Sequence, residues 1–389
     1  MKLKGITKNS KIAYVASGDF PQKNACYVQV AKNAQAWANE FEAFEFIVNL
    51  SFTNWFRRNS INIHSYYALK KNFSVCFFPW FDFERLNIPI LKNIYYKRVA
   101  KKCKKDGVDL IFTRTNVFAR YAIQNDIPVI VETHSPPEKT KDKLDLYSQM
   151  EDPKFLALVT ISEALKTRYV DFGLPEDKIM VAPDGVDLER FTPPLSIKQA
   201  RTELKLPHER LLAVYVGHLY DNRGVEEIIY AAERCQDVDF LLVGGHDEDI
   251  ERWRQKTKKM SNIKFQGFVN NGDVPKWLWA GNILLMPYST KCVTAEWMSP
   301  LKLFEYMAAG RAIISTDLPA LRTVLKDQDN AILVEPDSGD SLTSAIQNLV
   351  KKPDQCERLG KRAYEDVAQY TWNQRVRSIL SFISGKDVS

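Results

Sequence analysis

The chain has 389 residues, of which 45% are hydrophobic and 12% aromatic, and its formal net charge is +6. This composition excludes a disordered or fibrous chain, and the length is sufficient for two domains with separate cores. No apolar run reaches the roughly 18 to 20 residues of a membrane span, and residues 1–8 lack the apolar core of a signal peptide, so we expect a cytoplasmic protein.

The six cysteines and five histidines are scattered along the sequence without metal-ligand spacing. We therefore expect reduced thiols, no disulfide framework and no metal site.

Strands and helices alternate through the first half of the chain, which is typical of an α/β fold. The expected strands are residues 11–16, 44–50, 75–80, 109–114, 128–131, 155–160 and 178–183. The expected helices are residues 25–40, 61–71, 91–105, 117–124 and 162–169, the last capped by Ser162.

A basic and aromatic segment lies between Phe52 and Asp106, where twelve Lys or Arg residues accompany three acids. Cations interleaved with amphipathic rings suit an anionic membrane surface, and we expect peripheral contact with the inner face of the plasma membrane. An ordinary basic surface over an aromatic core explains the same composition. No nucleic-acid-binding motif accompanies the charge, so nucleic acid is not expected as a partner.

A polar loop, residues 132–137, follows the strongly apolar strand at 128–131. Open α/β sheets bind their ligands directly past the carboxyl ends of such strands. His134 in this loop therefore stands where we expect chemistry to occur.

The proline-rich residues 191–196 have the character of an interdomain linker. We place an N-terminal, acceptor-binding domain at 1–192 and a C-terminal, nucleotide-sugar-binding domain at 193–372. A final helix, about 373–389, is long enough to return to the first domain.

The strand and helix pattern restarts after this linker. The expected strands are residues 211–216, 240–243, 263–268, 283–286 and 312–315, and the expected helices are 224–234, a polar helix ending near 259, 274–279, 300–309 and three pieces between 341 and 383. Two doubly wound sheets facing each other across a cleft would account for the whole pattern.

The stretch from Ser299 to Gly310 reads as a short helix with marked ends: Ser299 as the N-cap, Pro300 at the first helical position and Gly310 as the stop. The start of such a helix, with Lys302 beside it, is a binding site for phosphate. Glu305 lies three residues later on the same face and can accept hydrogen bonds from the vicinal hydroxyls of a ribose. When this stretch is taken alone, an amphipathic helix with solvated charges is the better explanation.

Three further strand-end loops of the second half support a nucleotide site. The loop Gly217–Gly224 has small residues that allow a ligand to approach the backbone closely, and it carries the cation Arg223. Gly244-Gly245 follows the next strand, and the backbone of Gly267–Val269 can form hydrogen bonds with the edge of a flat base. Each loop alone is more often a plain turn, but their coincidence with the 299–310 helix favours nucleotide binding.

These residues resemble the large family of retaining glycosyltransferases with the GT-B fold, group 1 or family 4. The motifs that carry the resemblance are, in chain order, the Gly18 loop, Glu132-Thr133-His134, Val186-Asp187 with Phe191, Gly217–Gly224, Gly244-Gly245, Gly267–Val269 and Pro300–Ala308. The similarity is most specific from Val181 to Glu335. It implies transfer of a sugar from a UDP- or GDP-sugar with the anomeric configuration kept.

The resemblance also implies roles for individual residues. His134, Arg223 and Lys302 would be catalytic, with His134 contacting the transferred sugar or the acceptor. The donor would be bound by Gly18, Gly217, His218, Arg223, Gly244, Gly267, Phe268, Val269, Ser299, Pro300, Leu301, Lys302 and Glu305. Two positions depart from the family pattern, because Trp297 stands where a glutamate is usual and His218 where an arginine is usual.

We therefore expect a hexosyltransferase that uses a UDP-sugar, with UDP-glucose as the first candidate, and a glycan or lipid-linked acceptor in cell-surface polysaccharide biosynthesis. It would need no metal, because Arg223 and Lys302 supply the positive charge that the leaving diphosphate requires. The alternatives are a UDP-sugar 2-epimerase of the same fold and a non-catalytic nucleotide-sugar-binding protein.

Overall fold

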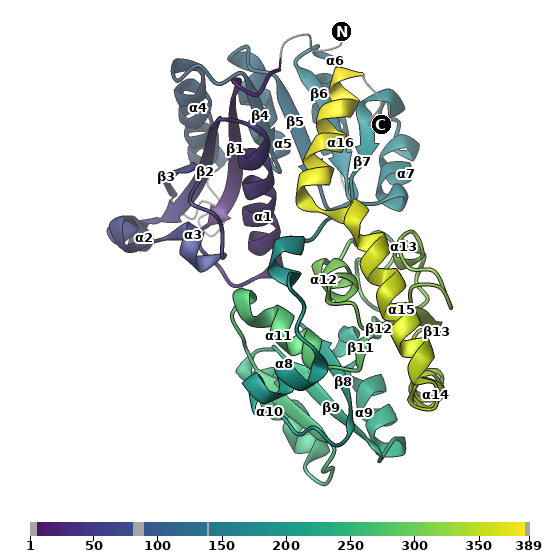
Figure 1. Cartoon of the computed structure of the whole chain (residues 1–389). Helices are drawn as coiled ribbons and strands as arrows, with labels where there is room; N and C mark the ends of the chain where they lie inside the picture. Colours follow the sequence, from purple (N-terminus) through teal and green to yellow (C-terminus); the bar gives the residue numbers. More distant parts are fainter. Residues whose placement is uncertain (1–5, 81–88, 138–139, 386–389) are drawn as a thin grey trace. The chain divides into compact units, whose positions relative to one another are not determined.

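A computed structural model describes residues 6–80, 89–137 and 140–385 of the chain. The chain forms two compact units, the first ending at Pro183 and resuming at Trp372, and the second running from Asp184 to Thr371 (Figure 1). Each unit is an α/β domain built around its own parallel sheet.

The first unit contains a seven-stranded parallel sheet in the order β3-β2-β1-β4-β5-β6-β7. Its strands are β1 (Lys11–Asp19), β2 (Ala43–Ser51), β3 (Ser74–Trp80), β4 (Leu110–Thr113), β5 (Val129–Thr133), β6 (Phe155–Thr160) and β7 (Ile179–Val181). The strand order reverses between β1 and β4, which makes this pair the topological switch point of a doubly wound sheet. The strands predicted from the sequence are confirmed.

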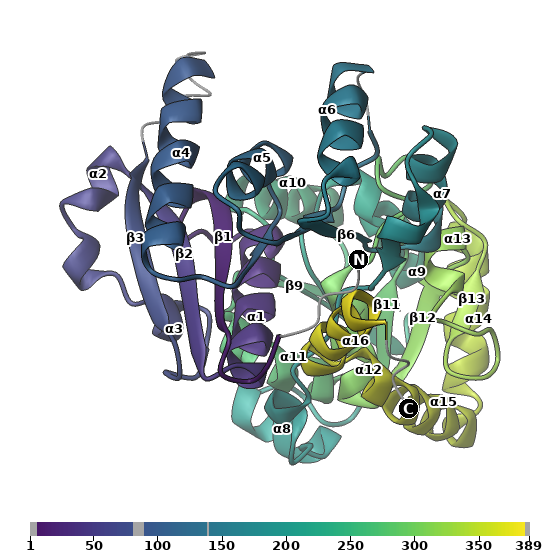
Figure 2. The ribbon, with the colours of Figure 1, turned by 90° about the horizontal axis from the view of Figure 1, so that it is seen from above.

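Helices cover both faces of this sheet. They are α1 (Ala25–Glu40), α2 (Phe52–Trp55), η1 (Arg58–Ser60), α3 (Ile63–Tyr66), α4 (Pro89–Lys105), α5 (Asn116–Gln124), α6 (Thr140–Glu151), α7 (Glu163–Asp171), η2 (Glu176–Lys178) and α16 (Trp372–Ser384). Figure 2 shows α1 and α16 on one face and α4, α5 and α6 on the other. The last helix, α16, belongs to this unit although the second unit precedes it in the chain.

Two helical predictions in this unit were incomplete. The helix expected over 61–71 is the single turn α3, because Ala68 takes a left-handed φ of 51° shortly after it and stops the helix. The helix α6 was not expected, because its sequence is mostly polar and lacks a wide apolar stripe. Its buried side chains among those described are Leu146 and Met150, one turn apart, and Gln149.

The second unit contains a six-stranded parallel sheet in the order β10-β9-β8-β11-β12-β13. Its strands are β8 (Leu211–Val216), β9 (Val238–Val243), β10 (Ile263–Gly267), β11 (Ile283–Met286), β12 (Ala312–Thr316) and β13 (Ile332–Val334). Its helices are η3 (Leu188–Phe191), α8 (Ile197–Leu204), η4 (Asp221–Arg223), α9 (Val225–Arg234), α10 (Asp247–Thr257), η5 (Asn271–Asp273), α11 (Val274–Ala280), α12 (Leu301–Ala309), α13 (Pro319–Arg322), α14 (Gly339–Val350), α15 (Pro353–Asp366) and η6 (Val367–Tyr370). The short edge strand β13 was not predicted. The switch point of this sheet lies between β8 and β11.

Successive side chains of β8 point to opposite faces of the sheet, and both faces are buried. Val214 and Val216 face a core shared with α11 and α12, whereas Ala213 and Tyr215 face a core shared with α9, α10 and α14. Both sets are apolar because helices cover both faces of a parallel sheet.

The first unit ends earlier than the predicted boundary at 192. Residues just after Pro183 are hydrogen-bonded to the second unit: the backbone N–H of Asp184 donates to Ser299 Oγ at 2.9 Å, and that of Val186 to the carbonyl of Tyr370 at 2.9 Å. These contacts, rather than the proline pair, decide where the chain changes unit. None of the described helices combines the length and apolarity that crossing a bilayer requires.

We expect Gly224→Ala to lower the melting temperature of the protein by about 4 to 8 °C, corresponding to about 2 kcal/mol. Gly224 has φ 77°, and a Cβ there would lie 1.7 Å from the carbonyl oxygen of Pro287. Gly272→Ala is the matched control, because no heavy atom lies within 4 Å of its added Cβ. Scanning calorimetry of both variants checks this prediction, which an unchanged transition in Gly224→Ala would contradict.

Candidate active site

A tyrosine side chain lies between β8 and β11 at the switch point of the second sheet. The strands β8 and β11 pair only at Ala213–Ile283 and Val214–Leu284 and then separate. The buried hydroxyl of Tyr306 fills the gap, accepting the N–H of Val216 at 2.7 Å and facing the carbonyl oxygen of Leu285 at 3.3 Å. Because Tyr306 belongs to α12, this helix is fixed at the position where doubly wound sheets bind ligands.

The start of α12 differs from the prediction by one residue. Pro300, in extended conformation, occupies the N-cap position, and no side chain caps the first turn. The predicted N-cap role of Ser299 is wrong, because its hydroxyl instead accepts the N–H of Asp184. The predicted stop is confirmed, with Gly310 in the left-handed conformation at φ 64°. The first N–H groups of α12 are therefore left to other partners.

Lys302 points from α12 toward the loop after β8. A Cβ at Gly217 would lie 2.4 Å from Lys302 Nζ, so the absence of a side chain at Gly217 makes this approach possible. The ammonium lies 4.0 Å from the ring centroid of Tyr215 and 5.2 Å from that of Tyr288. Within the described part of the chain, Lys302 forms no salt bridge with a carboxylate. Burial, followed by the charge of Arg223, lowers the pKa of Lys302 well below its ordinary value.

Arg223, at the end of η4, is the second cation of this site. Its guanidinium lies over the ring of Tyr288 at 5.1 Å, and its Nη1 donates to the sulfur of Cys292 at 3.1 Å. Cys292 is a buried residue, and no motif of the sequence singles it out. Arg223 and Lys302 thus both lie over the ring of Tyr288.

The three glycine loops lie side by side. The N–H of Gly217 donates to the carbonyl of Val243 at 2.9 Å, and that of Gly244 donates to the carbonyl of Gly267 at 2.7 Å. The ends of β8, β9 and β10 thus form one continuous backbone surface next to the two cations.

His218 stacks with two other rings. Its ring lies 4.9 Å from Tyr220 with an interplanar angle of 4°, and 5.3 Å from His246. Burial, followed by the positive charges around it, lowers the pKa of His218. His218 is therefore neutral at pH 7, unlike the arginine that the family pattern would place here.

Phe268 and Val269 border a cavity of about 490 Å³ in the second unit. Its other lining residues are Glu203, Leu204, Asn270, Asp273, Lys276 and Trp277. Phe268 is 53% exposed, so its ring is available for a further contact. Glu305, on the next turn of α12 after Lys302, has its Oε1 3.7 Å from Nη1 of Arg190.

A larger cavity, of about 590 Å³, lies at the opposite edge of the same sheet. Leu211, Ile283 and Ala312, the residues at the amino ends of β8, β11 and β12, border it. Ligands of open α/β sheets bind outside the carboxyl ends, so we do not place the active site there. Among the described residues, no group of three or more His, Cys, Asp and Glu side chains could hold a metal ion.

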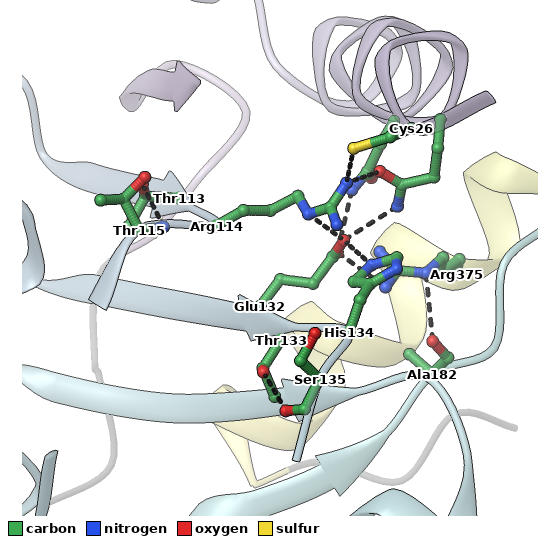
Figure 3. A network of polar contacts seen from close by, with 12 residues as sticks. Cys26, Thr113, Arg114, Thr115, Glu132, Thr133, His134, Ser135, Ala182 and Arg375 are labelled. Atoms are coloured by element: carbon green, nitrogen blue, oxygen red, sulfur yellow. Dashed lines mark hydrogen bonds and ion pairs between the residues drawn. The ribbon is translucent and has the colours of Figure 1, made fainter. Parts of the chain in front are cut away.

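The first unit places its own charged cluster at the carboxyl end of β5 (Figure 3). The Glu132 carboxylate is fully buried and accepts hydrogen bonds from Arg375 Nη2 at 2.7 Å and His134 Nε2 at 2.7 Å. Gln29 Nε2 at 2.8 Å and Asn33 Nδ2 at 3.1 Å complete the set, which we call the Glu132 cluster together with Arg114, whose Nε is 3.7 Å away. His134 thus stands at the predicted strand end, while Gly18 lies near the end of β1.

The charges around Glu132 decide its ionisation. Burial by itself raises the pKa of a carboxylic acid, but the charge of Arg375, the hydrogen bond from His134 and the charge of Arg114 outweigh it and hold the pKa of Glu132 well below its usual range. Glu132 is therefore an anion at neutral pH. A carboxylate only accepts hydrogen bonds, so Nε2 of His134 carries the hydrogen.

Sequence reasoning missed Glu132, Arg375 and Tyr306 as site residues. A signal existed for Glu132, because an acid inside an apolar buried strand must be paired or bound. Arg375 offered no signal, since it is 243 residues from its partner. Tyr306 was read as part of an amphipathic helix.

Two family models match the chain. Residues 210–352 match "Glycosyl transferases group 1", and residues 65–190 match "Glycosyltransferase Family 4". Together these matches cover well over half of the chain and fall in both units. The chain belongs to the family 4, group 1 glycosyltransferases. The resemblance carried by its sequence motifs is confirmed.

Curated relatives of this glycosyltransferase are distant. The phosphatidyl-myo-inositol mannosyltransferase of Mycolicibacterium smegmatis is 25% identical over 272 residues, covering 67% of this chain and 67% of that protein. The D-inositol 3-phosphate glycosyltransferase of Xylanimonas cellulosilytica is 23% identical over 221 residues, covering 54% and 52%. The matched regions span about half to two thirds of these relatives.

Solved structures of similar fold cover nearly the whole glycosyltransferase chain. Anabaena Alr3699/HepE, solved in complex with UDP and glucose, has a TM-score of 0.71 at 16% identity, covering 96% of this chain and 100% of that one. A glycosyltransferase from Rickettsia africae ESF-5 has a TM-score of 0.75 at 15% identity, covering 97% and 98%. The two Rossmann-like domains are those of the GT-B fold, as predicted.

Proposed function

We propose that this glycosyltransferase moves a hexosyl group from a UDP-sugar to a glycan or lipid-linked acceptor in cell-surface polysaccharide biosynthesis, with the anomeric configuration retained. The observation that carries the proposal is the approach of Lys302 to Gly217 beside the uncapped start of α12, with Arg223 and Lys302 both lying over the ring of Tyr288. Two cations and free helix N–H groups suit a diphosphate. Alr3699/HepE was also solved with UDP-glucose, which makes UDP-glucose our first candidate donor.

The remaining donor contacts follow from the same arrangement. Glu305 would accept hydrogen bonds from the ribose hydroxyls, and the backbone at Val269 would hold the base beside Phe268. The continuous backbone of the Gly217, Gly244 and Gly267 loops would lie against the nucleotide. We propose that Gly18 of the first unit approaches the donor phosphates.

Catalysis would depend on stabilising the leaving diphosphate. Charge builds on UDP as the glycosyl bond breaks, and Arg223, Lys302 and the start of α12 would stabilise it electrostatically. The acceptor hydroxyl would attack from the leaving-group side and pass its proton to the departing phosphate. His134 would position the sugar. Because protein cations supply the positive charge, we propose that the reaction needs no metal.

We expect UDP binding to raise the pKa of Lys302, because the diphosphate supplies the negative charge that the free site lacks. UDP binding at pH 8.5, where the phosphates are fully ionised, then takes up protons, and UDP affinity falls as the pH rises. Lys302→Met abolishes the uptake and weakens UDP binding by about 1.5 to 3 kcal/mol. Titration calorimetry in two buffers of different ionisation enthalpy measures both quantities.

The control for this experiment is Lys264→Met, which removes an exposed lysine from β10 of the same unit. It leaves both the affinity and the proton uptake unchanged. Proton uptake of wild-type size in Lys302→Met would contradict the assignment of Lys302 to the diphosphate.

We expect transfer from UDP-glucose, or from another member of a UDP-hexose panel, to a lipid-linked or soluble glycan, with an α-linked product and no effect of EDTA. NMR of the anomeric signals measures the configuration of the product.

We expect Arg223→Ala to lower kcat/KM, because it removes about 2 to 4 kcal/mol of transition-state stabilisation. A new sugar nucleotide formed without acceptor would instead identify an epimerase, and donor binding without turnover would favour a binding protein.

The exposed face of α4 makes a lipid-linked acceptor our choice over a soluble one. Lys97, Arg98, Lys101, Lys104 and Lys105 are exposed there, and the helix carries no acid. Phe56 in the preceding segment is 70% exposed. Exposed basic residues and an exposed apolar ring in the same unit suit the surface of an anionic membrane.

The triple variant Lys97→Gln, Arg98→Gln and Lys101→Gln should lose about 100-fold in affinity for vesicles containing 30% phosphatidylglycerol, since each cation near such a surface contributes about 1 kcal/mol. Vesicle co-sedimentation measures the affinity. Replacing Lys258, Lys259 and Lys264 with Gln removes the same charge from the second unit and should leave it unchanged. Equal losses in the two triple variants would show that only net charge matters.

A further inference from the structure

We propose that Arg375, carried by the last helix α16, is a positioning residue for His134 and acts through Glu132. This inference rests on the proposed function, because it assigns His134 to the sugar or acceptor. It adds a residue from the far end of the chain to the machinery of the first unit.

Arg375 itself is held in one place. Its side chain is buried, and its Nε faces the carbonyl oxygens of Ala182 at 3.3 Å and Pro183 at 3.0 Å. Its Nη2 then meets Glu132 Oε2 at 2.7 Å. Arg375 thus connects α16, the end of the β7 segment and β5 through a single planar group.

Glu132 depends on Arg375 for its charge. The nearest other guanidinium, that of Arg114, has its Nε 3.7 Å from the carboxylate and is also bound to Gln29 Oε1 at 3.0 Å. The contacts from Gln29 and Asn33 are neutral amides. A buried carboxylate without a close cation would take up a proton or leave its position.

His134 depends in turn on the ionised carboxylate. The hydrogen bond from its Nε2 to Glu132 Oε1, 2.7 Å long, fixes the tautomer and the plane of the ring. A protonated Glu132 could no longer enforce that tautomer, because it would offer a donor as well as an acceptor. The orientation of His134 toward a substrate is therefore set by Arg375, which reaches it through Glu132.

A purely structural role for the buried ion pair is the competing explanation, and a double variant separates the two. Arg375→Met leaves Glu132 as an uncompensated buried charge, whereas adding Glu132→Gln removes that charge. If the pair were only structural, restoring stability would restore activity. If it positions His134, stability returns while activity does not.

The experiment compares wild type, Arg375→Met, the Glu132→Gln and Arg375→Met double variant, and Arg377→Met. Arg377 lies on the same helix, is largely exposed and pairs with Glu40 at 2.8 Å, so it controls for loss of a cation from α16. Melting temperature, kcat, KM, UDP affinity and the tautomer of His134, from NMR of ¹⁵N-histidine-labelled protein, are measured for each.

We expect Arg375→Met to lower the melting temperature by about 10 °C and kcat by about 100-fold. The double variant regains most of the melting temperature but not kcat, and both variants lose the single Nε2–H tautomer of His134. UDP affinity stays unchanged, because the cations proposed to bind the diphosphate, Arg223 and Lys302, belong to the second unit, and Gly18 of the first unit is not part of the Glu132 cluster. Arg377→Met behaves as wild type.

Recovery of kcat in the double variant, or a single Nε2–H tautomer in Arg375→Met, would overturn the inference. The tautomer measurement also separates it from the proposed function. If the wild-type chain transferred no sugar, loss of the tautomer in Arg375→Met would still support the coupling, and its persistence would still refute it.

Discussion

The hydroxyl of Tyr306 is the contact on which the arrangement of the donor-side residues depends. It satisfies the backbone N–H of Val216 where β8 and β11 separate, and a gap at that position would otherwise leave polar backbone groups buried without partners. Because Tyr306 lies on α12, the same contact fixes the direction of that helix. Lys302, one turn earlier, then meets Gly217, and it lies over the ring of Tyr288 together with Arg223.

In the first unit, the site depends on a buried charge. Glu132 is a buried acid at the end of β5, and it is stable as an anion because hydrogen-bond donors from α1, the residue His134 and the returning helix α16 surround it. The last helix of the chain is therefore more than a cover for the sheet. It supplies the cation that allows a charged group to remain buried next to His134.

Much of the fold was predictable from local sequence. Apolar runs identified every strand of the first sheet and all but β13 of the second, because parallel strands covered on both faces must be apolar along their whole length. The failures were segments with weak local signals, such as the polar helix α6 and the single turn α3. The predicted Ser299 cap failed because its hydroxyl met the N–H of Asp184, a partner that is distant in sequence.

The sequence by itself determined the α/β class, the strand-end loops that carry glycines and cations, and the family resemblance, since these depend on the order and spacing of neighbouring residues. Only the tertiary structure decided which side chains meet. The pairing of Arg375 with Glu132, the approach of Arg223 to Cys292 and the insertion of Tyr306 between two strands all join residues from separate elements. Such contacts form because a buried charge or polar group must find a partner in space, and no local pattern records which residue it will be.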